Sequence, residues 1–314
     1  MEKAFKINNK TLMQKLIISV KKYWFLYLIM LFALTVLFIY AYVPMFFQLM
    51  LSFTDYRILD GIFGSRWVWF DNFKAVFAMP RIGQVIKNTL YLSALRFIFG
   101  FFPPLILAVF LFDIHNKYFK RVSQTIVYIP YFFSWVIIYS ISWGLFSYDG
   151  IFSSLITVFG GERENLLANV NLIRTLLIST SVWKNMGWGT IIYLAAMTAI
   201  PSELFDAARV DGCGPVRRIF VVTLPSIMNI VAFLGILAVG NILRNIDSEQ
   251  ILQFYTPGTY IKIDVIDTWV YRVGYREINY SIGAALAFLQ STISLVLILL
   301  ANHFSGKYAK VSIW

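Results

Sequence analysis

Long apolar stretches separated by shorter polar segments dominate this chain of 314 residues. A transmembrane helix needs about 20 consecutive, mostly apolar residues, and six stretches are long enough to span. What remains is too short for a large water-soluble domain. The pattern therefore predicts an all-α polytopic membrane protein with six transmembrane helices, in which residues 1–314 form a single transmembrane domain. The expected spans are residues 24–44, 90–112, 124–147, 172–198, 226–246 and 280–303.

Composition points to the same class of protein. Hydrophobic residues make up 59% of the chain and charged residues 14%, whereas soluble domains average about 45–50% and about 25%. The single cysteine, Cys213, excludes an internal disulfide framework and a cysteine-rich metal site. The net charge of +11 comes from basic residues scattered over loops. Because they form no basic helix or stripe, nucleic-acid binding is not expected.

The distribution of Lys and Arg predicts the orientation in the membrane, because cytoplasmic segments carry an excess of both. With six spans, one side holds the two termini and the loops 113–123 and 199–225, with 14 basic and 5 acidic residues. The opposite side holds 11 of each. We therefore expect cytoplasmic N- and C-termini in a multi-pass membrane protein.

The first apolar run follows a basic leader, residues 1–23. A cleaved signal peptide has an apolar core of about 7–15 residues, whereas this run continues for about 30 residues from Trp24 to Phe53. We interpret it as a retained first helix behind a cytoplasmic leader.

The polar segment 201–225, between the fourth and fifth spans, is the most patterned part of the chain. Pro201 and Glu203 are typical of a helix start, where the helix dipole favours an acid. The residues from Gly212 to Pro215 would break this helix, and Pro215 can begin a second short one before the chain re-enters the membrane. A rigid protruding knob fits this pattern better than an amphipathic interfacial helix.

Residues 206–225, DAARVDGCGPVRRIFVVTLP, resemble the EAA motif of ABC importer permeases. Asp206 stands where the family usually has Glu, and Val222 stands for the usual Ile. The segments YIPYFFSWV, WKNMGWGTIIYLAAM and DVIDTWVYRVG, and the ending ANHFSGKYAKVSIW, are similar to carbohydrate permeases of the MalF-like class, LplB type. The resemblance covers nearly the whole chain.

This resemblance implies a permease subunit of a binding-protein-dependent importer in a bacterial cell membrane. It would move a complex carbohydrate (an oligo- or polysaccharide) by alternating access. The implied partners are a second related permease chain, two ABC ATPase subunits, an extracytoplasmic solute-binding protein, the carbohydrate substrate and the surrounding lipid bilayer. Residues 201–225 would be the cytoplasmic EAA coupling loop that docks into the ATPase. The residues implied in that contact are Glu203, Asp206, Ala207, Ala208, Asp211, Gly212 and Arg217.

A P-loop ATPase requires the pattern G-x-x-x-x-G-K-[ST]. The only Gly-Lys pair, Gly306-Lys307, is followed by Tyr308. We therefore expect this chain not to be an enzyme and to hold no cofactor or metal, with ATP and Mg bound by the partner ATPase subunits.

Polar and aromatic residues inside the expected spans are candidates for the substrate path, because ionisable groups in a membrane usually face a cavity or a partner. Those of the fourth span recur at helical spacing on one face; those of the fifth do the same near its end, and the third carries a smaller set. A sugar site needs this mixture of aromatic faces, amides and charges. The candidates are Tyr139, Trp143, Ser181, Lys184, Asn185, Trp188, Asn241, Arg244 and Asn245.

Several alternatives remain open at this stage. Lys184 and Arg244 can instead pair with acids or snorkel to the interface, and Arg96 in the second span is more typical of a structural pair. The same permease could carry a glycerol phosphodiester or another polar solute. An ion-coupled secondary transporter would usually place carboxylates within its spans, where this sequence has essentially none. A membrane enzyme would need a clustered catalytic set, and none is visible.

Overall fold

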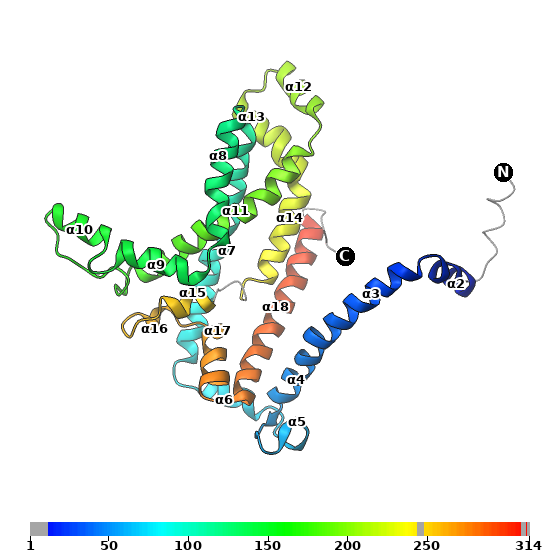
Figure 1. The fold of residues 1–314 in the computed structure, drawn as a ribbon, viewed down its shortest axis with the longest axis vertical. Helices are drawn as coiled ribbons and strands as arrows, with labels where there is room; N and C mark the ends of the chain where they lie inside the picture. The colour runs from blue at the N-terminus through cyan, green and yellow to red at the C-terminus, as the bar shows by residue number, and fades with distance from the viewer. Residues whose placement is uncertain (1–11, 244–247, 309–311, 313–314) are drawn as a thin grey trace.

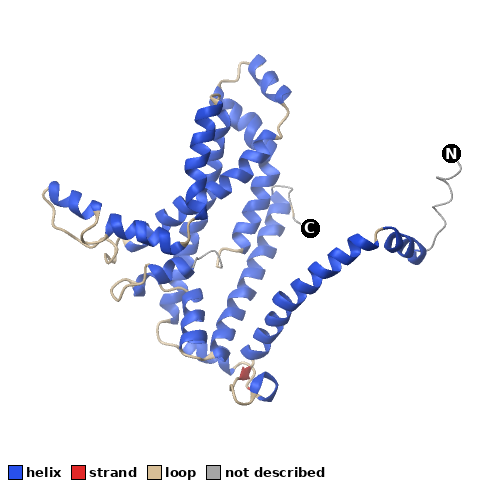
Figure 2. Ribbon diagram, in the orientation of Figure 1, coloured by secondary structure: helices blue, strands red, loops and turns tan. Residues whose placement is uncertain are grey.

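The computed structural model describes residues 12–243, 248–308 and 312, and this part of the chain is almost entirely helical (Figures 1 and 2). The expected all-α class is confirmed, apart from one short antiparallel strand pair in which Thr54 lies opposite Trp67. In chain order the elements are α2 (Leu12–Lys22), α3 (Trp24–Leu37), η1 (Phe38–Tyr42), α4 (Val43–Ser52), β1 (Thr54–Asp55), α5 (Gly61–Gly64), β2 (Arg66–Trp67), α6 (Asp71–Ala78), α7 (Ile82–Asp113), α8 (Lys117–Tyr128), η2 (Ile129–Phe132), α9 (Trp135–Phe146), α10 (Ile151–Val158), α11 (Ile173–Thr198), α12 (Ser202–Val210), α13 (Pro215–Arg218), η3 (Ile219–Thr223), α14 (Leu224–Gly240), α15 (Ser248–Gln253), α16 (Tyr260–Ile263), α17 (Ile266–Trp269), η4 (Val270–Arg276) and α18 (Tyr280–Tyr308).

Within the described residues, four helices are long and apolar enough to cross a membrane. They are Trp24–Ser52, Ile82–Asp113, Pro215–Gly240 and Tyr280–Lys307. Two further pairs of helices pass the same test together but are sharply bent, so the count reaches six only if each bent pair is one span. The multi-pass architecture is therefore confirmed, and the number of spans lies between four and six.

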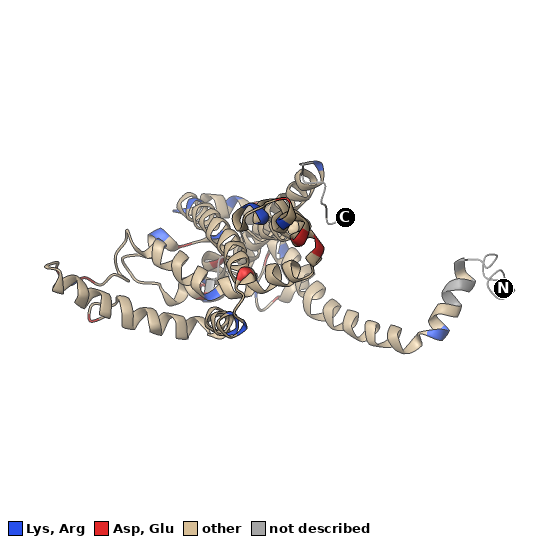
Figure 3. Cartoon of the chain, turned by 90° about the horizontal axis from the view of Figure 1, so that it is seen from above, with Lys and Arg blue, Asp and Glu red and all other residues tan. Residues whose placement is uncertain are grey.

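The first span, α3–η1–α4, runs away from the rest of the bundle, and its α3 part has no buried residue (Figure 1). Seen from above, the same helix carries no charged side chain between Trp24 and Ser52 (Figure 3). A π-helical turn, η1, precedes Pro44. Because proline has no N–H to donate, this wider turn lets the helix continue through it. The span therefore extends beyond the expected limit at residue 44.

The expected third span, 124–147, is not one helix, and this prediction was wrong in detail. The helical segment Lys117–Phe132 is bent by 106° from Trp135–Val158. Pro130 lies at the start of the 3-10 turn η2, and Ser134 caps α9 by accepting a hydrogen bond from the Ile137 N–H at 3.4 Å. Proline disfavours a continuous helix and serine favours a new N-terminus. Together they break the span.

The expected fifth span, 226–246, also has different limits. The second helix of the polar segment does not stop before the membrane: α13 continues through the π-helical turn η3 into α14. Pro225 follows directly after η3, and this wider turn lets the helix continue past a residue that has no N–H to donate. At the other end α14 stops at Gly240 with Asn241 as its C-cap.

Residues 247–279, between the fifth and sixth expected spans, were expected to form a loop on the external side; the part 248–277 is not a solvated loop but is folded against the bundle. It folds inward as α15, α16, α17 and η4, and buries Gln250, Phe254 and Val265 completely or nearly so. Phe254 packs in one hydrophobic cluster with Leu92 of α7 and Leu177 of α11. The segment is therefore part of the core, packed against α7, α9, α11 and α18.

The centre of the bundle is the long contact between α7 and α11. Two glycines of α11 allow this helix to approach its neighbours closely: a Cβ on Gly187 would lie 2.9 Å from the Tyr128 Cα of α8, and one on Gly189 would lie 2.9 Å from the Pro104 Cβ of α7. Real Cβ contacts of that length essentially never occur, so these positions are closed to larger residues. The helix α11 thereby becomes the fixed element from which the polar segment α12 departs.

Candidate functional site

The polar segment after α11 forms a helix that ends in a defined capping motif. The N–H of Gly212 donates to the Arg209 carbonyl at 3.0 Å, and the N–H of Cys213 donates to the Ala208 carbonyl at 2.9 Å. Gly212 adopts a left-handed φ of +71°. This is the Schellman arrangement, in which a left-handed residue, usually glycine, satisfies the last carbonyls of a helix. The sequence prediction of a helix, a glycine break and a second helical start is thus confirmed.

The resulting knob, defined here as residues 202–214, projects beyond the other helices at one end of the bundle (Figure 1). The Ala208 side chain is buried at its base, while Val210 is 89% exposed at its tip. Asp206 and Arg209 form an exposed ion pair at 2.7 Å, of a kind worth at most about 1 kcal/mol. Exposed apolar and polar side chains on a locally rigid helix are suited to docking. Of the predicted coupling residues, all but the buried Ala208 are exposed, namely Glu203, Asp206, Ala207, Asp211, Gly212 and Arg217.

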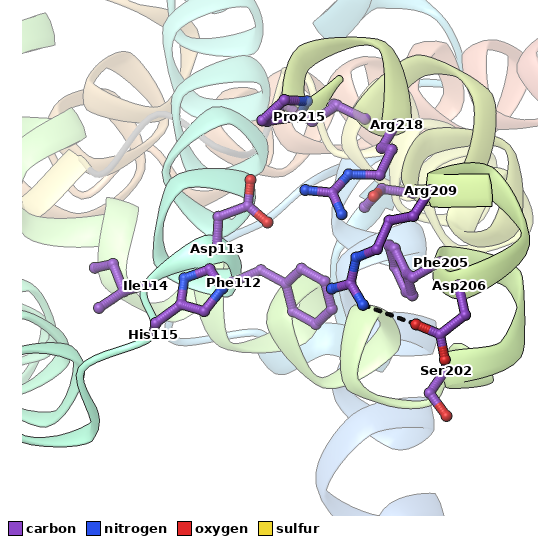
Figure 4. A pocket seen from close by; sticks show the side chains of 12 residues that line it. Phe112, Asp113, Ile114, His115, Ser202, Phe205, Asp206, Arg209, Pro215 and Arg218 are labelled. Atoms are coloured by element: carbon purple, nitrogen blue, oxygen red, sulfur yellow. Dashed lines mark hydrogen bonds and ion pairs between the residues drawn. The ribbon is translucent and has the colours of Figure 1, made fainter. Parts of the chain in front are cut away.

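A cavity of about 240 Å³ lies under the knob, between α12, α13 and the end of α7. The side chains of Asp113, Arg209 and Arg218 point into it, with His115 at its rim (Figure 4). The rings of Phe112 and Phe205 pack beside the cavity with their centroids 5.8 Å apart, and this contact connects the knob to α7. The position of the knob therefore depends on the end of α7, a helix that also lines the interior of the bundle.

Two of the predicted substrate-path residues, Lys184 and Trp188, face the break between η2 and α9. The Lys184 Nζ donates to the Tyr131 carbonyl at 2.9 Å and to the Phe133 carbonyl, and the Trp188 ring stacks on Tyr131 with centroids 4.9 Å apart. Carbonyls at a helix end need partners, and Lys184 supplies them. The structure thus gives both residues a packing role, and their part in a substrate path stays a prediction.

The other two candidates of α11, Ser181 and Asn185, face a different side of the helix. They line a cavity of about 310 Å³ between α7, α11 and α14, together with Ser93 and Arg96. The Asn185 Nδ2 donates to the Ser181 carbonyl at 3.0 Å. Sequence spacing placed all four α11 candidates on one face, but the neighbouring elements separate them into two pairs. We use the name central cavity for this space.

The described candidates outside α11 do not line the central cavity; they are Tyr139, Trp143 and Asn241. Tyr139 packs edge-to-face on Phe254 with centroids 5.1 Å apart, beside a half-exposed Trp143. Asn241 is exposed and donates through Nδ2 to the Leu237 carbonyl at 3.0 Å, closing the end of α14. The remaining two, Arg244 and Asn245, lie outside the described residues.

Sequence reasoning missed a buried polar network at the wall of the central cavity. The Arg96 Nη2 donates to the Gln250 Oε1. The Gln250 Nε2 in turn donates to the Leu177 carbonyl and to the Thr180 Oγ1, both at 2.8 Å. Arg96 is 8% exposed and Gln250 is fully buried. A glutamine expected in an external loop gave no signal of this role. The lone arginine inside a span did, and its hydrogen bond to Gln250 agrees with the structural pair that the sequence favoured for Arg96.

A second missed cluster holds the inward segment in place. The Asp264 carboxylate, only 1% exposed, accepts hydrogen bonds from the Trp269 Nε1 and the Thr268 Oγ1, both at 2.7 Å, and pairs with Arg272. Burial lowers the pKa of Arg272, but the hydrogen bond and charge of Asp264 raise it, and the net result is a pKa above the ordinary value. The Asn88 Nδ2 of α7 donates to the Asp264 carbonyl at 2.9 Å. These contacts fasten the inward segment to α7.

Comparison with known proteins places this architecture in a family. Residues 100–310 match the family described as binding-protein-dependent transport system inner membrane component. The chain is 35% identical to the polygalacturonan/rhamnogalacturonan transport system permease protein YteP of Bacillus subtilis (strain 168), over 98% of this chain and 96% of that one. It is also 35% identical to the protein LplB of the same organism, over 92% of this chain and 91% of that one.

A solved structure gives the same answer for the fold. A crystal structure of a bacterial alginate ABC transporter, in complex with an alginate pentasaccharide-bound periplasmic protein, superposes with a TM-score of 0.85. The aligned chains are 33% identical, and the match covers 94% of this chain and 98% of that one. The resemblance to carbohydrate permeases of the LplB type is therefore confirmed. The chain belongs to the family of inner membrane components of binding-protein-dependent transport systems, the ABC importer permeases.

Proposed function

We propose that this chain is a transmembrane permease subunit of an ABC importer that takes up an oligo- or polysaccharide. The observation that carries the proposal is the projecting knob, a capped helix with an exposed tip at one end of a bundle of apolar helices. Its placement suits a contact with a second protein at the membrane face. Family membership supports the interpretation of that protein as an ABC ATPase.

The relatives support a carbohydrate cargo. The name of YteP gives polygalacturonan and rhamnogalacturonan, and the superposed structure contains alginate, an acidic polysaccharide. Carboxylated sugars thus recur among proteins similar to this one. We propose that this chain also carries a complex saccharide, delivered by a solute-binding protein like the periplasmic protein of the alginate complex.

The proposed mechanism is alternating access in a complex of this chain, a second permease and two ATPases. With the N- and C-termini in the cytoplasm, the knob would meet the ATPases on the cytoplasmic face, where they bind and hydrolyse ATP with Mg. Movement of the knob would pass to α7 through the Phe112–Phe205 contact and to α11 directly, because α12 begins four residues after α11 ends. Both helices line the central cavity, so the cavity would open alternately to each side of the membrane.

The test is deletion of residues 206–214 in the complete importer, expressed with its partners. The deletion removes most of the knob and leaves α11 and the four long apolar helices intact. We expect the variant to insert in the membrane, to lose co-purification of the ATPase and to lose saccharide uptake. Normal ATPase co-purification and uptake in the inserted variant would contradict the proposal.

A further inference from the structure

A second groove runs along α7 and α11, and of its lining residues only Val182 also lines the central cavity. Its volume of about 700 Å³ lies within the range for small-molecule sites, about 300–1,000 Å³. The groove is open along one side, because the aromatic side chains of Tyr91, Phe99 and Trp183 that line it are 40% to 50% exposed. It is thus a binding surface separate from the central cavity, which we call the α7–α11 groove.

The lining of the α7–α11 groove changes from polar to apolar along its length. Around the start of α11 it is polar, with Asn171, Arg174 and Thr175, and Lys262 from α16. Met186 lines the groove 12 residues after Arg174, which at about 1.5 Å per residue is roughly 18 Å further along. This length is comparable with the hydrocarbon depth of one membrane leaflet, about 15 Å. The apolar residues that line this stretch are Leu95, Phe99, Ile178, Val182, Trp183 and Met186.

The polar end of the groove carries two positive charges, and one of them is held in a fixed position. The Arg174 Nε donates to the Lys262 carbonyl at 2.9 Å, and the Arg174 Nη2 donates to the Asn88 Oδ1 at 2.7 Å. The guanidinium carbon also lies 4.7 Å from the centroid of the Tyr91 ring. These three partners are neutral, so they orient the guanidinium without cancelling its charge.

No carboxylate balances the two charges within the described part of the chain. None of the described residues that line the groove is acidic, and the ion pairs among the described residues include neither Arg174 nor Lys262. Arginine has five N–H donors, of which the two hydrogen bonds above use two. Arginine and lysine both bind phosphate. The polar end is therefore suited to an anionic group, and the phosphate of a lipid is one that reaches it from the membrane.

The position of the groove favours a lipid over a helix as its occupant. The knob follows the end of α11, so the start of α11 lies at the opposite end of the bundle. A phospholipid in that leaflet brings its phosphate to the polar end and an acyl chain to the apolar stretch. The first span of a second copy of this chain has no charged residue between Trp24 and Ser52. It would therefore leave both cations without a counter-charge.

We infer that the α7–α11 groove binds one anionic phospholipid of the leaflet opposite the knob. Arg174 and Lys262 hold its phosphate, and one acyl chain lies along α11 as far as Met186. The lipid fills the seam between α7 and α11 and connects both helices to α16. Each basic residue near a membrane surface strengthens the binding of an anionic lipid roughly fivefold, so two of them give a preference of roughly 30-fold over a zwitterionic lipid.

The experiment titrates the complex purified through this chain with dioleoyl phosphatidylglycerol and with dioleoyl phosphatidylcholine, and native mass spectrometry measures the dissociation constant of each lipid. The two lipids share their acyl chains and differ in net charge. We expect phosphatidylglycerol to bind roughly 30-fold more tightly, and Arg174→Gln or Lys262→Gln to weaken its binding roughly fivefold without affecting phosphatidylcholine. The control Arg276→Gln, which removes an exposed charge at the end of η4 outside the groove, should bind both lipids as the wild type does.

Two variants keep the test independent of a folding defect in Arg174→Gln. The Lys262 side chain is exposed, so Lys262→Gln removes a charge without disturbing the core. Ser179→Trp fills the middle of the groove, where Ser179 is exposed, and should weaken the binding of both lipids. Equal affinities of the wild type for the two lipids, an undiminished preference in both Arg174→Gln and Lys262→Gln, or unchanged binding in Ser179→Trp would overturn the inference. Absence of bound lipid from the assembled complex would also overturn it, and would show that a neighbouring subunit covers the groove.

Discussion

The conformation of Gly212 makes a quantitative prediction about coupling. Its φ of +71° closes the Schellman motif of α12, and a Cβ added there meets no atom within 4 Å. Gly212→Ala therefore causes no clash, and its cost is only that of the left-handed backbone, about 1–2 kcal/mol for a residue with a Cβ. If the ATPase binds the capped form of the knob, this cost lowers its affinity roughly 5- to 30-fold.

A matched control lies two residues away. Gly214 also has open space where a methyl group would be added, but its φ is −67°, which any residue adopts. Gly214→Ala should therefore leave the affinity unchanged. The assay is titration of the purified ATPase subunit onto the detergent-solubilised permease pair, followed by biolayer interferometry. Equal affinities for Gly212→Ala and Gly214→Ala would show that the ATPase does not depend on the capped conformation.

Two further predictions concern the packing that positions the knob and the cavity. Gly187→Ala should lower the unfolding temperature in detergent, since its Cβ would approach the Tyr128 Cα to 2.9 Å and overpacking costs about 1–3 kcal/mol. The control Gly83→Ala adds a Cβ that meets no atom within 4 Å, so it should be neutral or slightly stabilising. Equal unfolding temperatures for the two variants would refute the close α8–α11 contact. Asp264→Asn should cost roughly 3 kcal/mol, because it leaves Arg272 without its buried partner. The pKa of Arg272 is raised, so the stability that its ion pair contributes is present below the ordinary arginine pKa and lost only above the raised one. Thermal unfolding should therefore show the same loss of stability in Asp264→Asn at about pH 6 and about pH 9. A loss of stability that changes across that range would contradict the ion pair.

The knob could be predicted from the sequence because its determinants are local. Pro201 and Glu203 start a helix, and the Gly212–Pro215 run ends it, and these propensities are not overridden because the segment touches little else. The helix of the expected fourth span, 172–198, was predicted within a residue at each end, since α11 runs from Ile173 to Thr198 and Pro201 follows shortly after it. The family resemblance was recognised largely from the polar segment that forms the knob, and the family match confirms it.

Features set by long-range contacts could not be predicted in this way. The inward fold of residues 248–277 depends on Gln250 meeting α11 and Asp264 meeting Asn88, pairs more than 70 residues apart. From sequence alone, polar residues in a segment between spans are expected to be exposed to solvent, because their buried partners are not known. Helical spacing likewise could not separate Ser181 and Asn185 from Lys184 and Trp188, because the neighbouring elements decide which side of α11 meets the central cavity.

The most direct test of the central claim is the composition of the native complex. Purification of this chain from its own membrane in mild detergent, followed by mass spectrometry, should recover a P-loop ATPase and a second permease of the same family in defined stoichiometry. Recovery of the chain alone, or only with copies of itself, under conditions that keep other ABC importers intact would contradict the account.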